Sequence, residues 1–272
     1  MNIISLSWRY LWSRPLAAAL NLLLMTLGLT SITFVLLASH QLERAFERDL
    51  AGIDVVVGAK GSPLQLILAG VFHIDVPPGN IPLAEVKALA EHPQVAQLIP
   101  LSLGDSFRGF RVVGTTADYV AHYQAKLARG ALWAVPMQAV LGAQVAATTG
   151  LNIGDRFTGA HGLDGGGDSH DQTPYTVAGV LAPCACVLDR LILTATESVW
   201  KVHEDMHGTD TPLDAEDQAA LEAERQVTIA LIRYKTPLAA VTFPRYVNSG
   251  TGMQAAAPAV EITRLLGMVG VG

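Results

Sequence analysis

The feature that most constrains this chain is an apolar run near its N-terminus, from Leu16 to Ser39, with no charged residue in 24 positions. As an α-helix with a rise of about 1.5 Å per residue, this run would be roughly 36 Å long. That length exceeds the hydrocarbon core of a bilayer, which is about 30 Å thick. A helix also satisfies its own backbone hydrogen bonds inside lipid. The sequence therefore predicts a transmembrane helix over residues 16–39.

Two other structures compete with a membrane anchor, a cleaved secretion signal and a buried core helix. Arg9 and Arg14 precede the run as the positive region of a signal does. A signal has a core of about 7 to 15 apolar residues that ends at small residues, whereas this run is longer and has Leu37 where the first small residue belongs. A core helix rarely stays free of charge for so long. We favour the anchor.

The orientation of the anchor depends on its flanks. Basic residues lie on both sides of the run, so the positive-inside rule alone does not decide it. Three aromatic residues, Trp8, Tyr10 and Trp12, lie where an interfacial belt would. Together with the positive amino terminus, they favour a cytoplasmic or interfacial segment over residues 1–15. Residues 40–50 mix acidic residues with arginine and are expected to continue the helix into water.

Composition limits the class of the remaining chain. Residues 40–272 are enough to bury a core in one large domain or two small lobes. A net charge of −6 and a pI near 5.7 argue against a nucleic-acid partner, which usually needs a basic patch. Strand and helix patterns mix without a steady βαβ rhythm. We predict an α+β fold, in which one N-terminal transmembrane helix precedes a mixed α/β extracytoplasmic domain of one or two lobes.

Hydrophobic periodicity places the elements of this domain. Strands are expected at residues 53–57, 95–103, 107–114, 175–181, 190–194 and 226–234. Helices are expected at residues 82–91, 139–149, 196–203, 237–247 and 258–266. Gly104 and Asp105 are expected to form the turn of a strand pair, and Gly150 to cap the second helix. Residues 159–174 and 204–224, rich in glycine or acidic residues, are expected to be exposed excursions.

One of these excursions gathers possible metal ligands, two imidazoles and three carboxylates within eleven residues. They are His161, Asp164, Asp168, His170 and Asp171. Histidine nitrogens and carboxylates suit Zn²⁺. Their spacing matches no known site, however, and the run of three glycines at residues 165–167 makes ordering of the loop costly in entropy. We favour a solvated loop, keep metal binding as the alternative, and assign no metal site.

The two cysteines, Cys184 and Cys186, are separated by one residue. On a regular strand such positions lie about 6.5 Å apart or more, whereas a disulfide prefers roughly 5.5 Å between Cα atoms. We therefore expect two thiols at a strand turn, with metal binding or a disulfide to a partner as alternatives. The cysteines do not form a lipid-attachment box, because they are internal and Pro183 precedes them.

The sequence lacks the motifs of nucleotide binding and of a hydrolase. Residues 58–63 (GAKGSP) do not have the spacing of a phosphate loop, and no strand is followed by a dinucleotide fingerprint. Serine, histidine and aspartate residues are scattered without a nucleophile elbow. We assign no catalytic or cofactor-binding residue and predict that the chain is not an enzyme. Trp133, Trp200 and Phe243 are expected in the core rather than in a ligand cage.

Several segments, in their order along the chain, carry a resemblance to a known family. They are the N-terminal run, residues 54–63 (DVVVGAKGSP), 141–155 (LGAQVAATTGLNIGD), 175–181 (YTVAGVL) and 253–262 (MQAAAPAVEI). Their order resembles the extracytoplasmic core domain of MacB-like and FtsX-like ABC transporter permeases. In such permeases this domain stands between the first and second membrane helices, and an ATPase on the cytoplasmic side moves it by tilting those helices.

The resemblance implies a permease subunit in the bacterial cytoplasmic (inner) membrane, with its N-terminus in the cytoplasm and its main domain outside. The implied partners are an ABC ATPase subunit, the lipid bilayer, a second permease subunit in a homo- or heterodimer, and a periplasmic accessory protein. Three further membrane helices are expected in such permeases, so we expect this sequence to be a fragment or to be completed by another chain.

The alternative function is a membrane-anchored extracytoplasmic binding or scaffold protein without a motor. A membrane-tethered hydrolase is a third and weaker hypothesis, because no nucleophile and base are visible together.

Overall fold

The computed structural model describes residues 2–162, 173–204 and 224–269. The chain folds as two compact units, residues 1–48 and 49–272. The first unit contains α1 (Ile3–Ser13) and α2 (Pro15–Leu50), the last two residues of which belong to the second unit. Proline has no backbone N–H to donate, so Pro15 begins a new helix instead of continuing α1.

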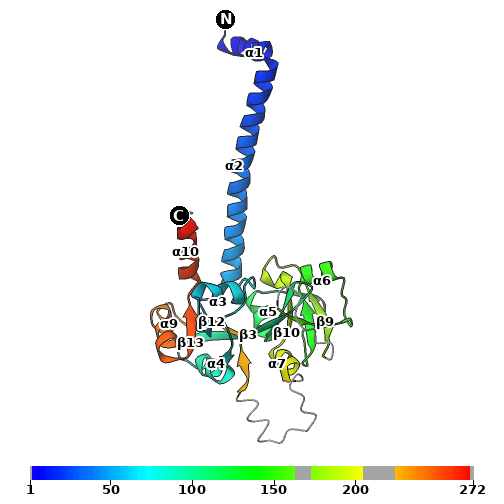
Figure 1. Cartoon of the computed structure of the whole chain (residues 1–272), viewed down its shortest axis with the longest axis vertical. Coiled ribbons are helices and arrows are strands. Elements are labelled where there is room, and N and C mark those ends of the chain that lie inside the picture. The colour runs from blue at the N-terminus through cyan, green and yellow to red at the C-terminus, as the bar shows by residue number, and fades with distance from the viewer. Residues whose placement is uncertain (1, 163–172, 205–223, 270–272) are drawn as a thin grey trace, which may run out of the picture. The chain divides into compact units, whose positions relative to one another are not determined.

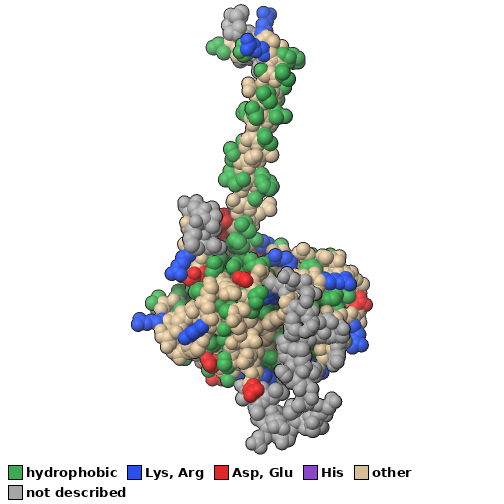
Figure 2. All heavy atoms as spheres, viewed as in Figure 1, with side chains coloured by type: hydrophobic (Ala, Val, Ile, Leu, Met, Phe, Trp, Pro, Cys, Tyr) green, Lys and Arg blue, Asp and Glu red, His purple; other side chains and the backbone are tan. Residues whose placement is uncertain are grey.

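Helix α2 is apolar and exposed around its circumference. Twelve large apolar side chains between residues 20 and 37 are 55–71% exposed, and Figure 2 shows such side chains along the visible face of the helix. Thr26 and Thr33 donate their hydroxyl groups to carbonyl oxygens of the preceding turn. Among the described residues, α2 is the one helix long and apolar enough to cross a membrane, and the predicted span 16–39 lies within it.

The second unit is built on one long path of strands. The order is β13 (Met253–Ala256), β1 (Val55–Ala59), β12 (Ile229–Tyr234), β3 (Val95–Phe107), β4 (Phe110–Thr115), β10 (Leu191–Ala195), β6 (Gln138–Leu141), β9 (Tyr175–Leu181) and β5 (Leu127–Gly130). Two short strands attach to this path, β7 (Arg156–Phe157) on β9 and β8 (Ala160–His161) on β3. A separate pair joins β2 (Ile81–Pro82) to β11 (Gln226–Val227).

Strand β3 divides this path into two lobes. Its first half pairs with β12, from Val95 to Leu101, and its second half pairs with β4, from Ser102 to Phe107. Each side has its own buried apolar cluster. The predicted mixed α/β domain is therefore confirmed, and it has two lobes on a shared strand (Figure 1).

Short helices cover the lobes. In the first lobe they are α3 (Pro63–Gly70), α4 (Leu83–Ala90), α9 (Ala239–Gly250) and α10 (Pro258–Val269). The remaining helices are α5 (Ala117–His122), α6 (Ala143–Thr149), the 3₁₀ turn η1 (Val187–Arg190) and α7 (Thr196–Glu204). Phe243 of α9 is fully buried, so its predicted core placement is confirmed. Trp200 of α7 is partly buried and packs against the core of the first lobe, and Trp133 is also only partly buried.

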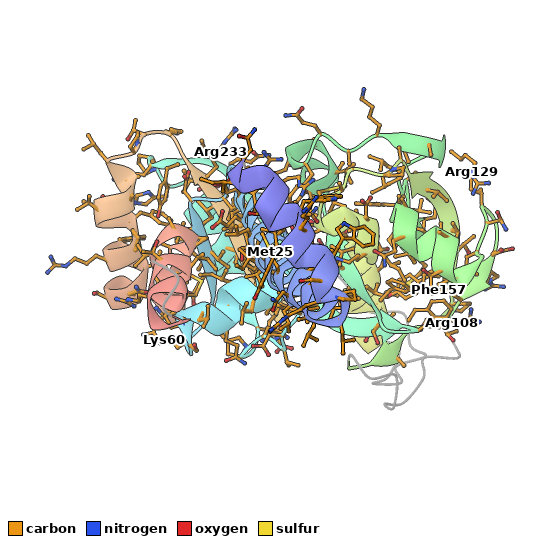
Figure 3. The ribbon with its side chains drawn as sticks, turned by 90° about the horizontal axis from the view of Figure 1, so that it is seen from above. Met25, Lys60, Arg108, Arg129, Phe157 and Arg233 are labelled. Carbon is orange, nitrogen blue, oxygen red and sulfur yellow. A yellow bond between two sulfur atoms is a disulfide. The ribbon has the colours of Figure 1, made fainter. Side chains whose placement is uncertain are left out.

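The predicted turn between two strands is wrong. The turn between β3 and β4 is at Arg108 and Gly109, which have φ values of 48° and 81°, and not at Gly104 and Asp105. Strand β3 continues through Asp105 because β8 pairs with it there. The Arg108 guanidinium at this turn lies over the ring of Phe107, which packs against Phe157 of the second lobe (Figure 3).

The expected helix over residues 139–149 is a strand followed by a helix. Residues 138–141 form β6 between β10 and β9, and α6 begins only at Ala143. A short apolar run fits a buried strand as well as a helix, and pairing with two neighbours decides for the strand. Gly150 ends α6 with φ 74°, which confirms the predicted left-handed cap.

Candidate functional site

Helices α2 and α10 are connected to neighbouring strands of the sheet. Strand β1 follows α2, strand β13 precedes α10, and the two strands pair antiparallel, with Val56 opposite Ala256 and Ala59 opposite Met253. In an antiparallel pair, the start of one strand lies beside the end of the other. The chain therefore passes from α2 into the sheet and from the sheet into α10 at the same end of this strand pair.

Both connections are short and hydrogen-bonded. Residues 51–54 join α2 to β1, and in this stretch the Asp54 N–H donates to the Ile232 carbonyl at 2.9 Å while the Asp54 carboxylate accepts the Tyr234 N–H at 2.6 Å. Ala257 alone separates β13 from α10, and its carbonyl accepts the Val260 and Glu261 N–H groups of that helix. Each helix end is therefore joined to the sheet by a short segment that is held by hydrogen bonds.

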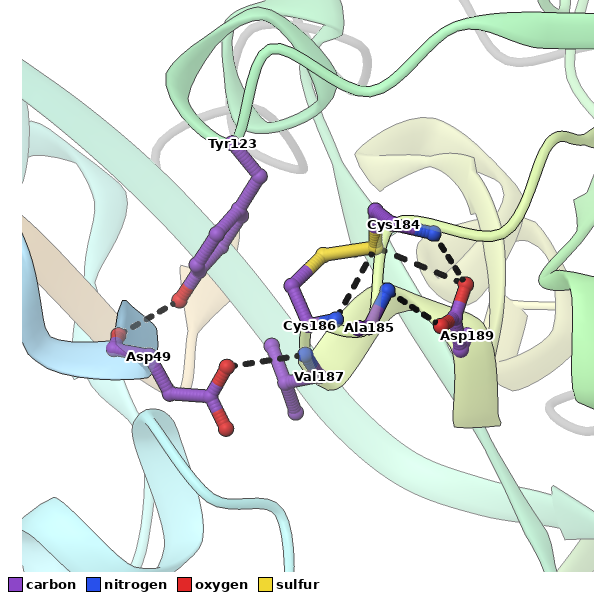
Figure 4. Close-up of a disulfide and its surroundings, with 7 residues drawn as sticks. All are labelled: Asp49, Tyr123, Cys184, Ala185, Cys186, Val187 and Asp189. Atoms are coloured by element: carbon purple, nitrogen blue, oxygen red, sulfur yellow. Dashed lines mark hydrogen bonds between the residues drawn. A yellow bond between two sulfur atoms is a disulfide. The ribbon is translucent and has the colours of Figure 1, made fainter. Parts of the chain in front are cut away.

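Asp49, in the last turn of α2, is the central residue of the site. Its side chain is only 7% exposed. One carboxylate oxygen accepts the Val187 N–H at 3.0 Å, and its carbonyl oxygen accepts the Tyr123 hydroxyl at 2.9 Å (Figure 4). A carboxylate at a helix C-terminus opposes the helix dipole. This unfavourable position is offset here by hydrogen bonds from the domain.

Aromatic and imidazole groups extend the site inward from Asp49. The rings of Tyr123 and Tyr119 lie edge to face, 5.4 Å apart, and Tyr119 Oη forms a hydrogen bond of 2.9 Å with His73 Nε2. Burial raises the pKa of Tyr119 and of Tyr123, and the charge of Asp49 adds to both increases. Burial, with smaller contributions from Arg111 and Arg190, lowers the pKa of His73 to about 3.

These pKa shifts leave the side chains of His73, Tyr119 and Tyr123 without charge. At neutral pH His73 is uncharged, and both phenols keep their protons. The cluster therefore works as a set of neutral donors and acceptors beneath the Asp49 carboxylate. It links the end of α2 with α5 and with the loop after α3, which is also tied to β4 through an Arg111 side-chain bond to the Asp75 carbonyl at 2.8 Å.

The other side of the site is a disulfide loop. Cys184 and Cys186 form a disulfide with a Cα–Cα distance of 5.1 Å, so the expectation of two free thiols is wrong. That expectation assumed extended backbone, but Ala185 has φ 54°, in the left-handed region, and the bend brings the two Cα atoms together. The loop is held further by the Asp189 carboxylate, which accepts the Cys184 N–H at 3.0 Å and the Ala185 N–H at 2.8 Å.

The disulfide loop orients the donor that reaches Asp49. Val187 directly follows Cys186 and begins η1, so the bend at Ala185 decides where the Val187 N–H points. The amide lies in the interior, since the Val187 side chain is 1% exposed. Asp49, Val187 and the Cys184–Cys186 disulfide thus form one connected group of residues, which we call the α2 anchor.

Four of the five predicted metal ligands, Asp164, Asp168, His170 and Asp171, lie outside the described residues. The fifth, His161, lies in β8, opposite Asp105. Within the part of the chain that the structure describes, no group of three or more His, Cys, Asp or Glu residues is placed to hold a metal ion. The excursion predicted at 204–224 lies almost entirely outside the described residues.

The segment compared with a phosphate loop has a structural role. Ser62 caps α3, where its hydroxyl oxygen accepts the Gln65 N–H at 3.4 Å, and Pro63 occupies the first helical position.

A family model described as the MacB-like periplasmic core domain matches residues 18–228, more than half of the chain. The chain belongs to this family. For a MacB-like chain, the N-terminal apolar helix and the mixed α/β domain together indicate an inner-membrane location with an extracytoplasmic domain. The sequence resemblance described above is thereby confirmed for the match over 18–228, and residues 253–262 lie beyond that match.

Individual relatives of this MacB-like chain are distant. It is 26% identical over 102 residues, or 38% of its length, to the pyoverdine export ATP-binding/permease protein PvdT of Pseudomonas fluorescens (strain Pf0-1). The match spans only 14% of the length of PvdT.

Two solved structures are similar at low sequence identity. The periplasmic region of MacB from Actinobacillus actinomycetemcomitans has a TM-score of 0.49 at 12% identity, covering 81% of this chain and 97% of that one. The extracellular domain of the noncanonic ABC-type transporter YknZ from Gram-positive bacteria has a TM-score of 0.43 at 12% identity, covering 74% of this chain and 98% of that one.

Of the residues of the α2 anchor, only the two cysteines stand out in the sequence. One signal was present, because Asp49 puts an acid in the last turn of a helix, where the dipole disfavours it. Such an acid needs a donor from elsewhere in the fold. Its donor, Val187, is 138 residues away in sequence, which no local pattern reveals.

Proposed function

We propose that this chain is the permease (membrane) subunit of an ABC transporter of the mechanotransmission type. A partner ATPase on the cytoplasmic side hydrolyses ATP, and the periplasmic domain couples that hydrolysis to the movement or release of an envelope substrate. The observation that carries the proposal is the pairing of β1 with β13, which puts the connections to α2 and α10 on adjacent strands.

The geometry of the α2 anchor supports a mechanical role. A hydrogen bond to a charged group contributes about 1.5–3 kcal/mol, roughly twice the value for a neutral pair. The bond between Asp49 and Val187 is of this kind, and it holds the end of α2 to a turn that packs against α6. Motion of α2 therefore reaches η1 in the second lobe as well as β1 in the first. Such coupling needs geometry and no catalytic side chain or cofactor in the outer domain.

The proposal includes an arrangement in the membrane. Residues 1–15 lie in the cytoplasm or at the inner interface, residues 16–39 cross the bilayer, and residues 40–272 form the extracytoplasmic domain. The partners are an ABC ATPase subunit, a second permease subunit in a homo- or heterodimer, and a periplasmic accessory protein. Support comes from the family membership and from the apolar surface of α2.

The test is co-purification of the intact gene product with its ATPase in mild detergent, followed by ATP hydrolysis measured with and without the permease. We expect a stable complex in which hydrolysis differs at least twofold from that of the ATPase alone. An ATPase without its phosphate-loop lysine serves as the blank. Clean separation of the two proteins, with unchanged hydrolysis, would refute the permease and leave a membrane-anchored extracytoplasmic binding or scaffold protein.

A matched pair of variants links this activity to the anchor. Asp49→Ala removes the acceptor of the Val187 N–H, whereas Glu47→Ala removes an exposed acid from the same helix. We expect Asp49→Ala to abolish the effect of the permease on hydrolysis while the complex still forms, and Glu47→Ala to behave as wild type. An equal effect of the two variants on ATP hydrolysis would show that the α2 anchor has no part in the coupling.

A further inference from the structure

We propose that the Cys184–Cys186 disulfide is a thiol-exchange site, at which a protein dithiol of the envelope reduces the disulfide and thereby releases the α2 anchor. The consequence for transport rests on the function proposed above. The exchange itself and the release of the anchor do not, because both concern contacts within residues 49–272.

The disulfide closes a very small loop. A disulfide stabilises a fold chiefly by restricting the unfolded chain, and this effect grows with the number of residues enclosed. Here one residue, Ala185, lies between the cysteines. That residue is alanine at φ 54°, a conformation that L-residues with a Cβ atom adopt rarely. The bond therefore contributes little to global stability and holds a local conformation that reduction lets relax.

The two cysteines differ in their exposure to solvent. Cys184 is partly exposed and Ala185 is exposed, whereas Cys186 is only 7% exposed. An external thiolate therefore reaches Cys184 Sγ more readily than Cys186 Sγ. Exchange requires an attacking thiolate in line with the sulfur–sulfur bond, and the leaving sulfur is then that of Cys186.

The exchange proceeds through a mixed disulfide. The first thiolate of the dithiol attacks Cys184 Sγ, a mixed disulfide forms, and Cys186 leaves as a thiolate that takes a proton from water. The second thiolate of the dithiol then attacks its own partner sulfur in the mixed disulfide, and Cys184 leaves and is protonated. The dithiol has lost two electrons and two protons and become a disulfide, and the two cysteines have gained them.

Two neighbouring groups can form hydrogen bonds with Cys184 Sγ after reduction. Cys184 Sγ lies 3.4 Å from an Asp189 carboxylate oxygen, so the new thiol has an acceptor for its S–H. The Cys186 backbone N–H lies 3.2 Å from Cys184 Sγ and donates to it as negative charge develops there.

Reduction acts on the anchor through the backbone. Val187 is the next residue after Cys186, and its N–H donates to Asp49 from the end of the bend at Ala185. Once Ala185 can return to negative φ, the Val187 N–H loses its fixed direction. The end of α2 then keeps the Tyr123 bond to the Asp49 carbonyl and loses the bond to the Asp49 carboxylate.

The experiment uses the full chain in detergent, with dithiothreitol as the dithiol and without denaturant. Thiols are counted by maleimide mass tagging, which is unambiguous because the chain has two cysteines. Amide hydrogen exchange is followed in parallel over residues 184–190, with the amides of β10 as the internal reference. We expect two tags per chain after reduction and about tenfold faster exchange at Val187, with β10 unchanged.

Asp49→Ala is the matched variant for this test. In its oxidised state, Val187 should already exchange at the rate of reduced wild type, and dithiothreitol should add less than twofold. The double variant Cys184→Ser, Cys186→Ser should, without added dithiol, show the Val187 exchange rate of reduced wild type. If that double variant fails to fold, reduction of the wild type still decides the result.

Two results overturn the proposal. One is a disulfide that dithiothreitol leaves intact until the domain unfolds, and the other is full reduction with unchanged exchange at Val187. Neither measurement involves the ATPase. Failure of coupled hydrolysis would therefore refute the proposed function alone, and failure of the exchange measurement would refute this inference alone.

Discussion

Replacing Asp49 by alanine gives the sharpest stability test of the α2 anchor. The substitution leaves the buried Val187 N–H without its acceptor, and the loss of a hydrogen bond to a charged group costs about 1.5–3 kcal/mol. Removing an acid from the C-terminal end of a helix stabilises the helix by about 0.5 kcal/mol. The Tyr123 bond is kept, because it goes to the backbone carbonyl. We expect a net destabilisation of about 1–2.5 kcal/mol.

Thermal unfolding of the full chain in detergent measures this effect. For a domain spanning residues 49–272, each kcal/mol lowers Tm by about 2–4 °C, so Asp49→Ala should melt about 2–10 °C below wild type. Asp49→Asn keeps an acceptor oxygen and should lose less than half as much. Glu47→Ala, which removes an exposed acid, should stay within about 0.5 kcal/mol of wild type. Equal melting temperatures for Asp49→Ala and Glu47→Ala would refute the reasoning.

Two further predictions concern residues that flank the anchor. His73 has a folded-state pKa of about 3 against an ordinary 6.5, so below pH 6.5 the unfolded chain binds a proton that the folded chain does not, and stability falls as pH falls from 6.5 towards 3. Denaturant titrations at several pH values should show a shallower fall for His73→Gln, and identical slopes would contradict this. A Cβ at Gly142 would lie 2.1 Å from the Leu188 carbonyl oxygen, whereas one at Gly104 meets nothing within 4 Å. Gly142→Ala should therefore cost about 1–3 kcal/mol in thermal melts, and a loss no larger than that of Gly104→Ala would contradict the close contact.

Much of the architecture was predictable from local patterns. The uncharged run over residues 16–39 predicts a long helix because a helix satisfies the backbone hydrogen bonds within its own segment. Strand β9 was predicted with its observed bounds, since alternating apolar residues bounded by turns have one good structure. Gly150 was predicted as a left-handed cap because glycine has no Cβ to clash there. The order of such segments was also enough to predict the family.

The secondary structure of short apolar runs depends on their neighbours in the fold. Residues 139–141 fit a helix or a strand equally well, and only the presence of β10 on one side and β9 on the other makes them strand β6. The same holds for Gly104 and Asp105, which look like a turn until β8 pairs with β3 beside them. Pairing with distant segments overrides a weak local preference, and the identity of those segments is not visible nearby in sequence.

The α2 anchor belongs entirely to the tertiary structure. By itself the sequence determined that a long apolar helix, a candidate membrane span, precedes a mixed pattern of strands and helices, because periodicity and charge act between near neighbours. It did not determine that Asp49 meets Val187 across 138 residues, or that Ala185 bends far enough to join two cysteines. Those contacts exist only after both lobes have packed. A hydrogen bond depends on direction within tenths of an ångström, and only the completed packing sets directions so closely.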